Sequence, residues 1–190
     1  MNENSKIKET ISLLIIDDHK MVREGLKIML ASLKNSILFK IQEAESGEEA
    51  LMKIDRFNFD VAIVDYQMPG MSGIETIQRI LRSKPQLKIL ALSNYDELSY
   101  IESMMDAGAN GFVLKNIEPA EMLKALRTIL SDKIYYCNEV SIKIIEAAEN
   151  KNTKTVQLGK ILSTRETEVL QMIAMEMTND EIGQKLFLAK

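Results

Sequence analysis

The chain has 190 residues, of which 46% are hydrophobic and 27% are charged, and its formal net charge is -4. This balance is typical of a globular protein with enough length for one full domain and part of a second. The overall acidity excludes a protein that binds polyanions with its whole surface.

The sequence also predicts where the protein is found. No apolar stretch has the length of a membrane span, so we expect no membrane association. The polar N-terminal residues lead directly into a predicted strand and do not resemble a signal peptide. Cys137 is the only cysteine, so an internal disulfide cannot form, and no basic residue near it in sequence would activate it as a nucleophile. We therefore expect a protein of the reducing cytoplasm.

Short apolar runs alternate with amphipathic segments between residues 12 and 131. The runs are predicted strands, at 13–17, 39–44, 61–65, 87–92 and 112–114. The amphipathic segments are predicted helices, at 21–33, 47–55, 74–81, 97–107 and 119–130. Runs that are apolar throughout are typical of strands buried on both faces of a parallel sheet. Strand–helix units in series predict an α/β fold, a five-stranded parallel doubly wound sheet with the flavodoxin-like strand order 2-1-3-4-5.

The residues after Ser131 follow a different pattern. A further helix is predicted at 138–148, with Val140, Ile144 and Ile145 along one side. The next stretch, 149–155, is polar throughout and is predicted to be a linker.

A small all-α unit is predicted to follow the linker. Ser163 and Glu166 have the spacing of a capping box at the start of a helix, and Thr178 and Glu181 repeat that spacing. Two short helices joined so closely indicate a helix-turn-helix segment.

Polar side chains stand where the predicted strands end. Asp17 and Asp18 close the first run, Asp65 closes the third, Ser93 follows the fourth, and Lys115 follows the fifth. The carboxyl ends of parallel strands share one edge of a sheet, so these groups are expected to converge. Three carboxylates repel one another unless a cation joins them, and hard oxygen ligands suit Mg²⁺. The hydroxyl and the ammonium could hold an anion beside that cation, so the sequence predicts a site that carries a phosphoryl group on Asp65.

Four local strings match a known family in order and spacing: IIDDH, VDYQMPGMSG, ALSNYDE and GFVLKN. With them, the chain resembles the receiver domain of two-component response regulators. The strings LSTRETEVLQMIA and TNDEI resemble the first two helices of a LuxR-type DNA-binding domain. Together they resemble a NarL/FixJ-type transcription regulator. The expected domains are a receiver at 11–132, a linker with a helix at 133–159 and a partial LuxR-type helix-turn-helix at 160–190.

The resemblance implies a role for each acidic residue of the site. An isolated aspartate at this place would be taken for a helix or turn cap, but with Asp17, Asp18 and Lys115 at the other strand ends Asp65 is the expected phosphoacceptor. Asp17 and Asp18 are expected to hold Mg²⁺ together with Asp65 and the main-chain carbonyl of Gln67.

The resemblance also implies roles for the neighbouring side chains. Lys115 would pair with the phosphoryl oxygens, and Ser93 would move toward them and donate a hydrogen bond. Phe112 would follow that movement as a switch residue, with plain core packing as the alternative. His19, the only histidine, is expected to be structural.

The function implied is regulatory and not enzymatic. A sensor histidine kinase would phosphorylate Asp65, and the change would control either homodimerisation or release of the DNA-binding domain, and so transcription. A phosphatase of the haloacid dehalogenase type also uses an aspartate nucleophile and Mg²⁺. Such an enzyme needs an acid two residues after the nucleophile, where this chain has Gln67.

The C-terminal segment leaves a second function open. In LuxR-type domains the DNA-reading helix follows the TNDEI helix, and the sequence stops near that point, as expected of a truncated domain. Residues 155–190 carry four basic and five acidic side chains, so no basic footprint for DNA is visible. The alternative is therefore a phosphorylation-dependent protein-interaction module that does not bind DNA in this form. A gel shift with and without phosphorylation would distinguish the two.

Overall fold

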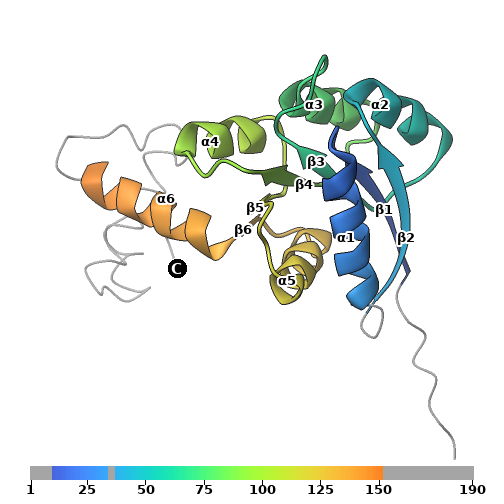
Figure 1. Ribbon diagram of the computed structural model, residues 1–190. Coiled ribbons are helices and arrows are strands. Elements are labelled where there is room, and N and C mark those ends of the chain that lie inside the picture. Colours follow the sequence, from blue (N-terminus) through green and yellow to red (C-terminus); the bar gives the residue numbers. More distant parts are fainter. Residues whose placement is uncertain (1–9, 34–36, 152–190) are drawn as a thin grey trace, which may run out of the picture. The chain divides into compact units, whose positions relative to one another are not determined.

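The computed structural model describes residues 10–33 and 37–151 (Figure 1). Strands and helices alternate through this part of the chain. The elements, in order, are β1 (Thr10–Ile16), α1 (Lys20–Ser32), β2 (Leu38–Ala44), α2 (Gly47–Arg56), β3 (Val61–Asp65), α3 (Gly73–Ser83), β4 (Lys88–Ser93), α4 (Leu98–Asp106), β5 (Gly111–Leu114), α5 (Pro119–Leu130), β6 (Tyr135–Tyr136) and α6 (Asn138–Lys151).

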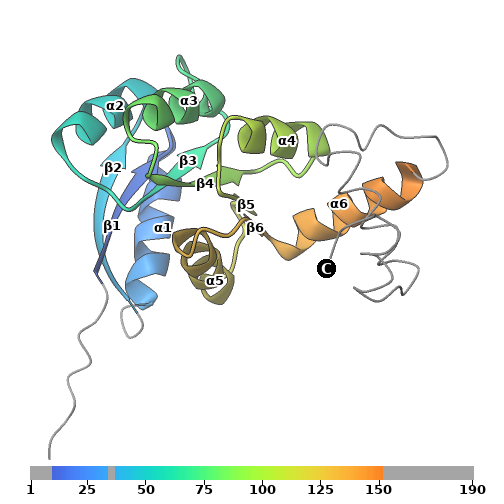
Figure 2. The ribbon, with the colours of Figure 1, turned by 180° about the vertical axis from the view of Figure 1, so that it is seen from behind.

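The strands form one parallel sheet in the order β2-β1-β3-β4-β5-β6. Helices α1 and α5 cover one face, and α2, α3 and α4 cover the other (Figures 1 and 2). The first five strands confirm the predicted doubly wound α/β fold and its flavodoxin-like order. The order reverses at β1, so β1 and β3 are neighbours whose following helices lie on opposite faces.

The sheet is held by a core of aliphatic side chains. Strand β3 is buried along its whole length, and β1 and β4 are buried over most of theirs, because helices cover both faces of the sheet. Burial of each such Leu or Ile side chain contributes about 1.5–3 kcal/mol relative to leaving it in water. The strand ends are therefore fixed in position, and β3 and β4 remain in register up to the pair Asp65 and Leu92.

Two predictions about the region after α5 need correction. The two-residue strand β6 was not expected, since it is too short to show a periodic pattern. Helix α6 continues to Lys151, so the linker predicted at 149–155 is helical in its first three residues. Ile145 is 57% exposed and does not share the buried side of α6 with Val140. The capping boxes predicted at Ser163 and Thr178 lie outside the described residues.

The segment after α5 packs against the sheet. The Cys137 N–H donates a hydrogen bond to the Phe112 carbonyl (3.1 Å), and Val140 is fully buried in the core. Lys143 of α6 pairs with Asp96 at 2.5 Å. A compact unit accordingly extends to Ile145. Burial raises the pKa of the Cys137 thiol, which agrees with the expectation that it is not a nucleophile.

Within residues 10–33 and 37–151, no helix has the length and apolar character needed to cross a membrane.

Candidate functional site

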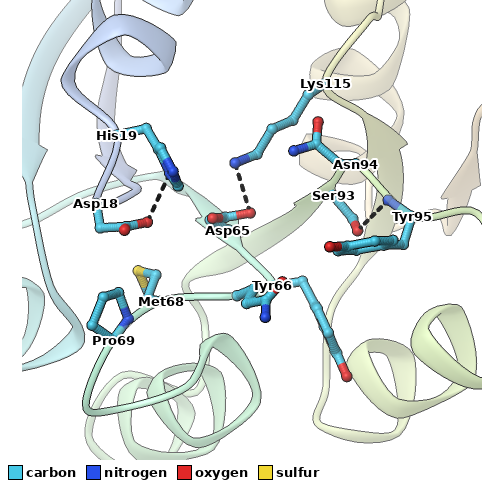
Figure 3. A pocket seen from close by; sticks show the side chains of 11 residues that line it. Asp18, His19, Asp65, Tyr66, Met68, Pro69, Ser93, Asn94, Tyr95 and Lys115 are labelled. Carbon is cyan, nitrogen blue, oxygen red and sulfur yellow. Dashed lines mark hydrogen bonds and ion pairs between the residues drawn. The ribbon is translucent and has the colours of Figure 1, made fainter.

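A cavity of about 490 Å³ opens at the carboxyl edge of the sheet (Figure 3). It lies beyond the ends of β1, β3, β4 and β5, where a parallel sheet places its ligands. Its lining comes from the last residues of β3 and β4 and from the loops that follow the four strands: Asp18, His19, Asp65, Tyr66, Gln67, Met68, Pro69, Ser93, Asn94, Tyr95 and Lys115.

Lys115 joins two of the predicted acids. Its Nζ lies 3.0 Å from Asp65 Oδ1 and 2.8 Å from Asp17 Oδ2. Asp17 is fully buried and Asp65 is 3% exposed. The lysine itself is positioned by its main chain, because its N–H donates to the Ser93 carbonyl at 2.8 Å. Three residues from different strand ends therefore meet, as the sequence predicted.

The negative charge of the acids at this site exceeds the positive charge of Lys115. Burial and the charge of Asp17 raise the pKa of Asp65 to about 6, although Lys115 acts in the opposite direction. Burial by itself would lower the pKa of the Lys115 ammonium, but its hydrogen bonds to Asp17 and Asp65 outweigh burial, and the pKa is raised. One lysine thus does not neutralise the acids around it.

The acidic cluster has the chemistry of a cation site. Asp17, Asp18, His19 and Asp65 each place one ligand atom within 4.8 Å of the others. At an effective dielectric constant of about 20, two carboxylates at that separation repel by roughly 3.5 kcal/mol. Two buried carboxylate oxygens of the cluster have one nitrogen neighbour each: Asp17 Oδ2 contacts Lys115 Nζ at 2.8 Å, and Asp18 Oδ1 contacts His19 Nδ1 at 2.9 Å, with no further donor among the described residues. Buried acceptors of this kind fit a hard divalent cation such as Mg²⁺.

His19 contributes to the turn that carries the acid pair. Its main-chain N–H donates to Asp17 Oδ1 at 2.7 Å, and its ring Nδ1 lies 2.9 Å from Asp18 Oδ1. The side chain is 62% exposed. His19 occupies the N-cap position of α1, but its side chain does not cap the helix. Its contacts go to Asp17 and Asp18 instead, in the turn between β1 and α1. The structural role expected of His19 stays a prediction.

Ser93 and Phe112 lie where the sequence placed them. The Ser93 hydroxyl is buried and accepts a hydrogen bond from the Tyr95 N–H at 2.9 Å. Phe112 is fully buried on β5, paired in register with Ala91 and Tyr136. This packing is the alternative that the sequence left open for Phe112. Its role as a switch stays a prediction.

The loop after β3 forms one side of the cavity. Met68 and Met71 are buried beneath it, so they anchor the loop in the protein. The Ser72 side chain accepts a hydrogen bond from the Glu75 N–H and caps α3. The Gly73 N–H donates to the Tyr66 carbonyl at 3.1 Å, which closes the loop. Gln67 lines the cavity from this loop.

Some residues around the site were not expected from the sequence. Tyr66 lines the cavity, and its ring lies 4.8 Å from that of Tyr100 on α4. Arg23 is 9% exposed and donates to the Asp17 carbonyl at 2.7 Å. One signal could have revealed Arg23: it occupies a buried position of α1 in line with Leu26 and Leu30, where an apolar residue would be usual.

The raised pKa of Asp65 predicts a pH-dependent stability in metal-free protein. The native state binds a proton on Asp65 more tightly than the unfolded state, whose pKa is near 3.8. The stabilisation is therefore complete below about pH 4 and is lost as the pH rises through about 6, by up to about 3 kcal/mol. Asp65→Asn should gain stability relative to the parent over this interval, measured by urea unfolding in EDTA. A stability difference that stays constant from pH 4 to 7 would contradict this account.

Two family models match the chain. The response regulator receiver domain matches residues 13–127, and the luxR family of bacterial regulatory proteins matches residues 160–190. The first match spans the sheet, the helices around it and the cavity. The second lies outside the described residues.

Curated proteins and solved structures match over nearly the whole chain. Transcriptional regulatory protein DegU of Brevibacillus brevis is 29% identical, covering 98% of this chain and 85% of its own length. Oxygen regulatory protein NreC of Staphylococcus aureus is 34% identical, covering 94% and 84%. The Salmonella typhimurium response regulator RcsB, in a structure concerned with DNA interaction, is 26% identical with a TM-score of 0.67, covering 95% and 85%. The chain therefore belongs to the two-component response regulators that join a receiver domain to a LuxR-type helix-turn-helix.

Proposed function

We propose that Asp65 accepts a phosphoryl group from a sensor histidine kinase and that the phosphorylated receiver controls DNA binding and transcription. The observation that carries this proposal is the convergence of Asp65, Lys115 and the acid pair at one sheet edge, with Ser93 on the neighbouring strand. A cytoplasmic location is part of the proposal.

The chemistry assigned to Asp65 is a nucleophilic displacement at phosphorus. A carboxylate oxygen forms a P–O bond as the P–N bond of the kinase phosphohistidine breaks, and the leaving imidazole keeps the electron pair and takes up a proton. Lys115 would pair with a phosphoryl oxygen, a role supported by its ion pair with Asp65 at 3.0 Å. Asp17, Asp18, Asp65 and the Gln67 carbonyl would hold Mg²⁺. When bound, the ion neutralises charge on the transferred group.

The response assigned to the receiver begins at Ser93. Its hydroxyl would leave the Tyr95 N–H and donate to the phosphoryl group, and Phe112 would adjust to that change. The face formed by α4, β5 and α5 would then alter either homodimerisation or release of the DNA-binding domain.

We assign phosphorylation to the expected receiver domain at 11–132 and DNA binding to the expected helix-turn-helix at 160–190. The expected linker at 133–159 joins them. Homology to DNA-binding response regulators favours a DNA partner over the interaction-only alternative. One structure of the relative RcsB contains two dimers bound to two parallel DNAs. That assembly is the kind of partner arrangement that we propose for this chain.

Removal of Asp18 should test the metal part of the proposal. Asp18→Ala takes away one of the clustered carboxylates, so the affinity for Mg²⁺ should fall by at least about tenfold, since even changes around a metal ligand cost this much. Isothermal titration with MgCl₂ measures the affinity directly. Glu48→Ala removes an exposed acid outside the cluster and should have little effect. Equal affinities in the two variants would argue against a metal role for Asp18.

Tyr95 should control the lifetime of the phosphorylated state. Its side chain lines the cavity, with its ring 5.4 Å from that of Tyr100, and it lacks a carboxylate that could orient an attacking water. Tyr95→Ala should open a path for water and speed the loss of phosphate without kinase, followed on Phos-tag gels. Tyr95→Phe keeps the ring and should decay like the parent. Decay of Tyr95→Ala that is equal or slower would refute this steric role.

A further inference from the structure

Arg23 is a buried cation whose guanidinium contacts the main chain of the acid pair. It lies in the first turn of α1, and its side chain is 10% exposed. A buried guanidinium is stable only where its donors are matched to acceptors. The acceptors of Arg23 therefore indicate what the side chain does.

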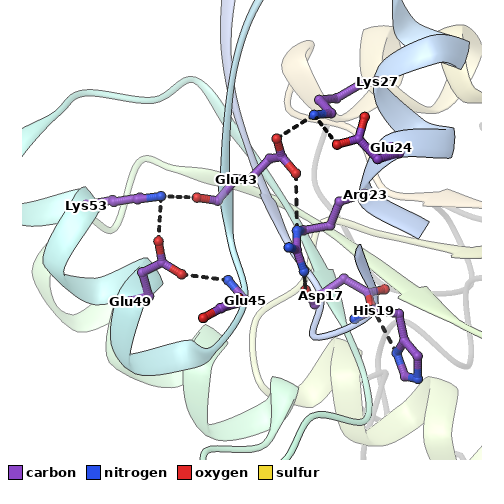
Figure 4. A network of polar contacts seen from close by, with 9 residues as sticks. All are labelled: Asp17, His19, Arg23, Glu24, Lys27, Glu43, Glu45, Glu49 and Lys53. Atoms are coloured by element: carbon purple, nitrogen blue, oxygen red, sulfur yellow. Dashed lines mark hydrogen bonds and ion pairs between the residues drawn. The ribbon is translucent and has the colours of Figure 1, made fainter. Parts of the chain in front are cut away.

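The guanidinium bridges two segments of the protein (Figure 4). Its Nη1 donates to the Asp17 carbonyl at 2.7 Å, a buried contact. Its Nε donates to Glu43 Oε2 on β2 at 3.2 Å. Glu43 is itself held by Lys27, whose Nζ lies 2.6 Å from the other carboxylate oxygen. The planar fork of an arginine suits this arrangement, because its donors point in fixed directions.

The contact with the Asp17 carbonyl bears on Asp18 in particular. That carbonyl belongs to the peptide plane that joins Asp17 to Asp18, so holding it restricts where the Asp18 Cα can lie. The main-chain N–H of Asp17 is already fixed, since it donates to the Ala44 carbonyl at 3.2 Å. Strand β1 ends at Ile16 and α1 begins at Lys20, so Asp18 lies in the connecting turn and belongs to neither element. Arg23 thus restrains the part of the turn that the sheet leaves unrestrained.

We infer that Arg23 is a positioning residue that, through the Asp17 carbonyl and with Glu43 as its anchor, sets the affinity of the acid pair for a divalent cation. This inference rests on the proposed function, because it assigns Asp17 and Asp18 to metal binding.

The direction in which Mg²⁺ affinity changes when Arg23 is removed distinguishes a positioning role from a purely electrostatic one. If Arg23 acted only as a positive charge near the site, its removal would reduce repulsion and tighten Mg²⁺ binding. If it positions the turn, its removal weakens binding, by about tenfold for a contact to a ligand residue. Arg23→Met should therefore show a dissociation constant for Mg²⁺ about tenfold higher, by isothermal titration of the full chain. Labelling by acetyl phosphate should need correspondingly more Mg²⁺ and reach nearly the parental rate at saturation.

A second pair of variants keeps the test decisive where Arg23→Met folds poorly. Glu43→Gln weakens the anchor of the guanidinium and should raise the dissociation constant for Mg²⁺. Lys27→Gln removes the other partner of Glu43, leaves the bond from Arg23 in place and should bind Mg²⁺ like the parent. A general loss of stability would lower the melting temperature without this difference between the two variants.

The outcomes distinguish this inference from the proposed function. Failure of the parent chain to bind Mg²⁺ or to be labelled on Asp65 would overturn the proposed function. Normal binding and labelling of the parent, with unchanged or tighter Mg²⁺ binding in Arg23→Met or in Glu43→Gln, would overturn the positioning role alone.

Discussion

Asp65→Asn should abolish labelling of the chain by acetyl phosphate in the presence of Mg²⁺. The substitution keeps the shape of the side chain but removes the carboxylate that would attack phosphorus. The neighbouring acids are not expected to replace it, because Asp17 and Asp18 are the carboxylates assigned to hold Mg²⁺. Label is measured on Phos-tag gels and by its loss in hydroxylamine, which cleaves acyl phosphates.

The same strand offers a matched control. Asp60 stands at the amino end of β3, and its Oδ2 accepts a hydrogen bond from the Ser12 N–H at 2.8 Å, which an asparagine oxygen can also accept. Asp60→Asn should retain full labelling. Hydroxylamine-sensitive label that persists in Asp65→Asn would show that another residue is the acceptor.

Gly73→Ala should cost about 3 kcal/mol in the free energy of unfolding and should impair labelling. A Cβ at Gly73 would lie 2.1 Å from the Asp65 carbonyl oxygen and 2.9 Å from that of Tyr66. Both are main-chain atoms, so the β3–α3 loop must shift to make room, and overpacking of this kind is destabilising. Guanidinium unfolding measures the first effect, and the initial rate of labelling measures the second, because the displaced atoms belong to Asp65 itself.

Gly25→Ala is the contrasting change. Gly25 lies within α1, and nothing comes within 4 Å of a Cβ built there. Alanine is the better helix former, so this variant should be more stable by about 1 kcal/mol and should be labelled normally. Similar stability of the two alanine variants would mean that the contact at Gly73 is relieved without cost.

The fold was predictable because its signals are local and strong. Buried strands show as apolar runs, and β3 begins and ends where its run does. Helix α5 has the bounds predicted for it, and it begins at Pro119, a residue that suits the first turn of a helix. Strand β6 gave no such signal, because two residues carry no periodicity and its pairing depends on the neighbouring β5.

The site was predictable to the level of residues but not of contacts. Parallel topology brings strand ends to one edge, so the meeting of Asp17, Asp65 and Lys115 follows from their places in the sequence. The hydrogen bond from Tyr95 to Ser93 and the bond from Arg23 to a main-chain carbonyl do not follow. They depend on rotamers and on loop geometry, which packing of the whole unit decides.

The pairing of β6 with β5 has a consequence for hybrid regulators in which one output domain replaces another. A receiver cut at residue 132 would bare the hydrogen-bonding edge of β5 and lose the buried Tyr135, Cys137 and Val140. The unpaired edge of β5 could then pair with the edge of another fragment, so the fragments would tend to associate. Exchange of output domains should therefore leave the chain intact at least to Ile145, so that each receiver carries its own edge strand into the hybrid.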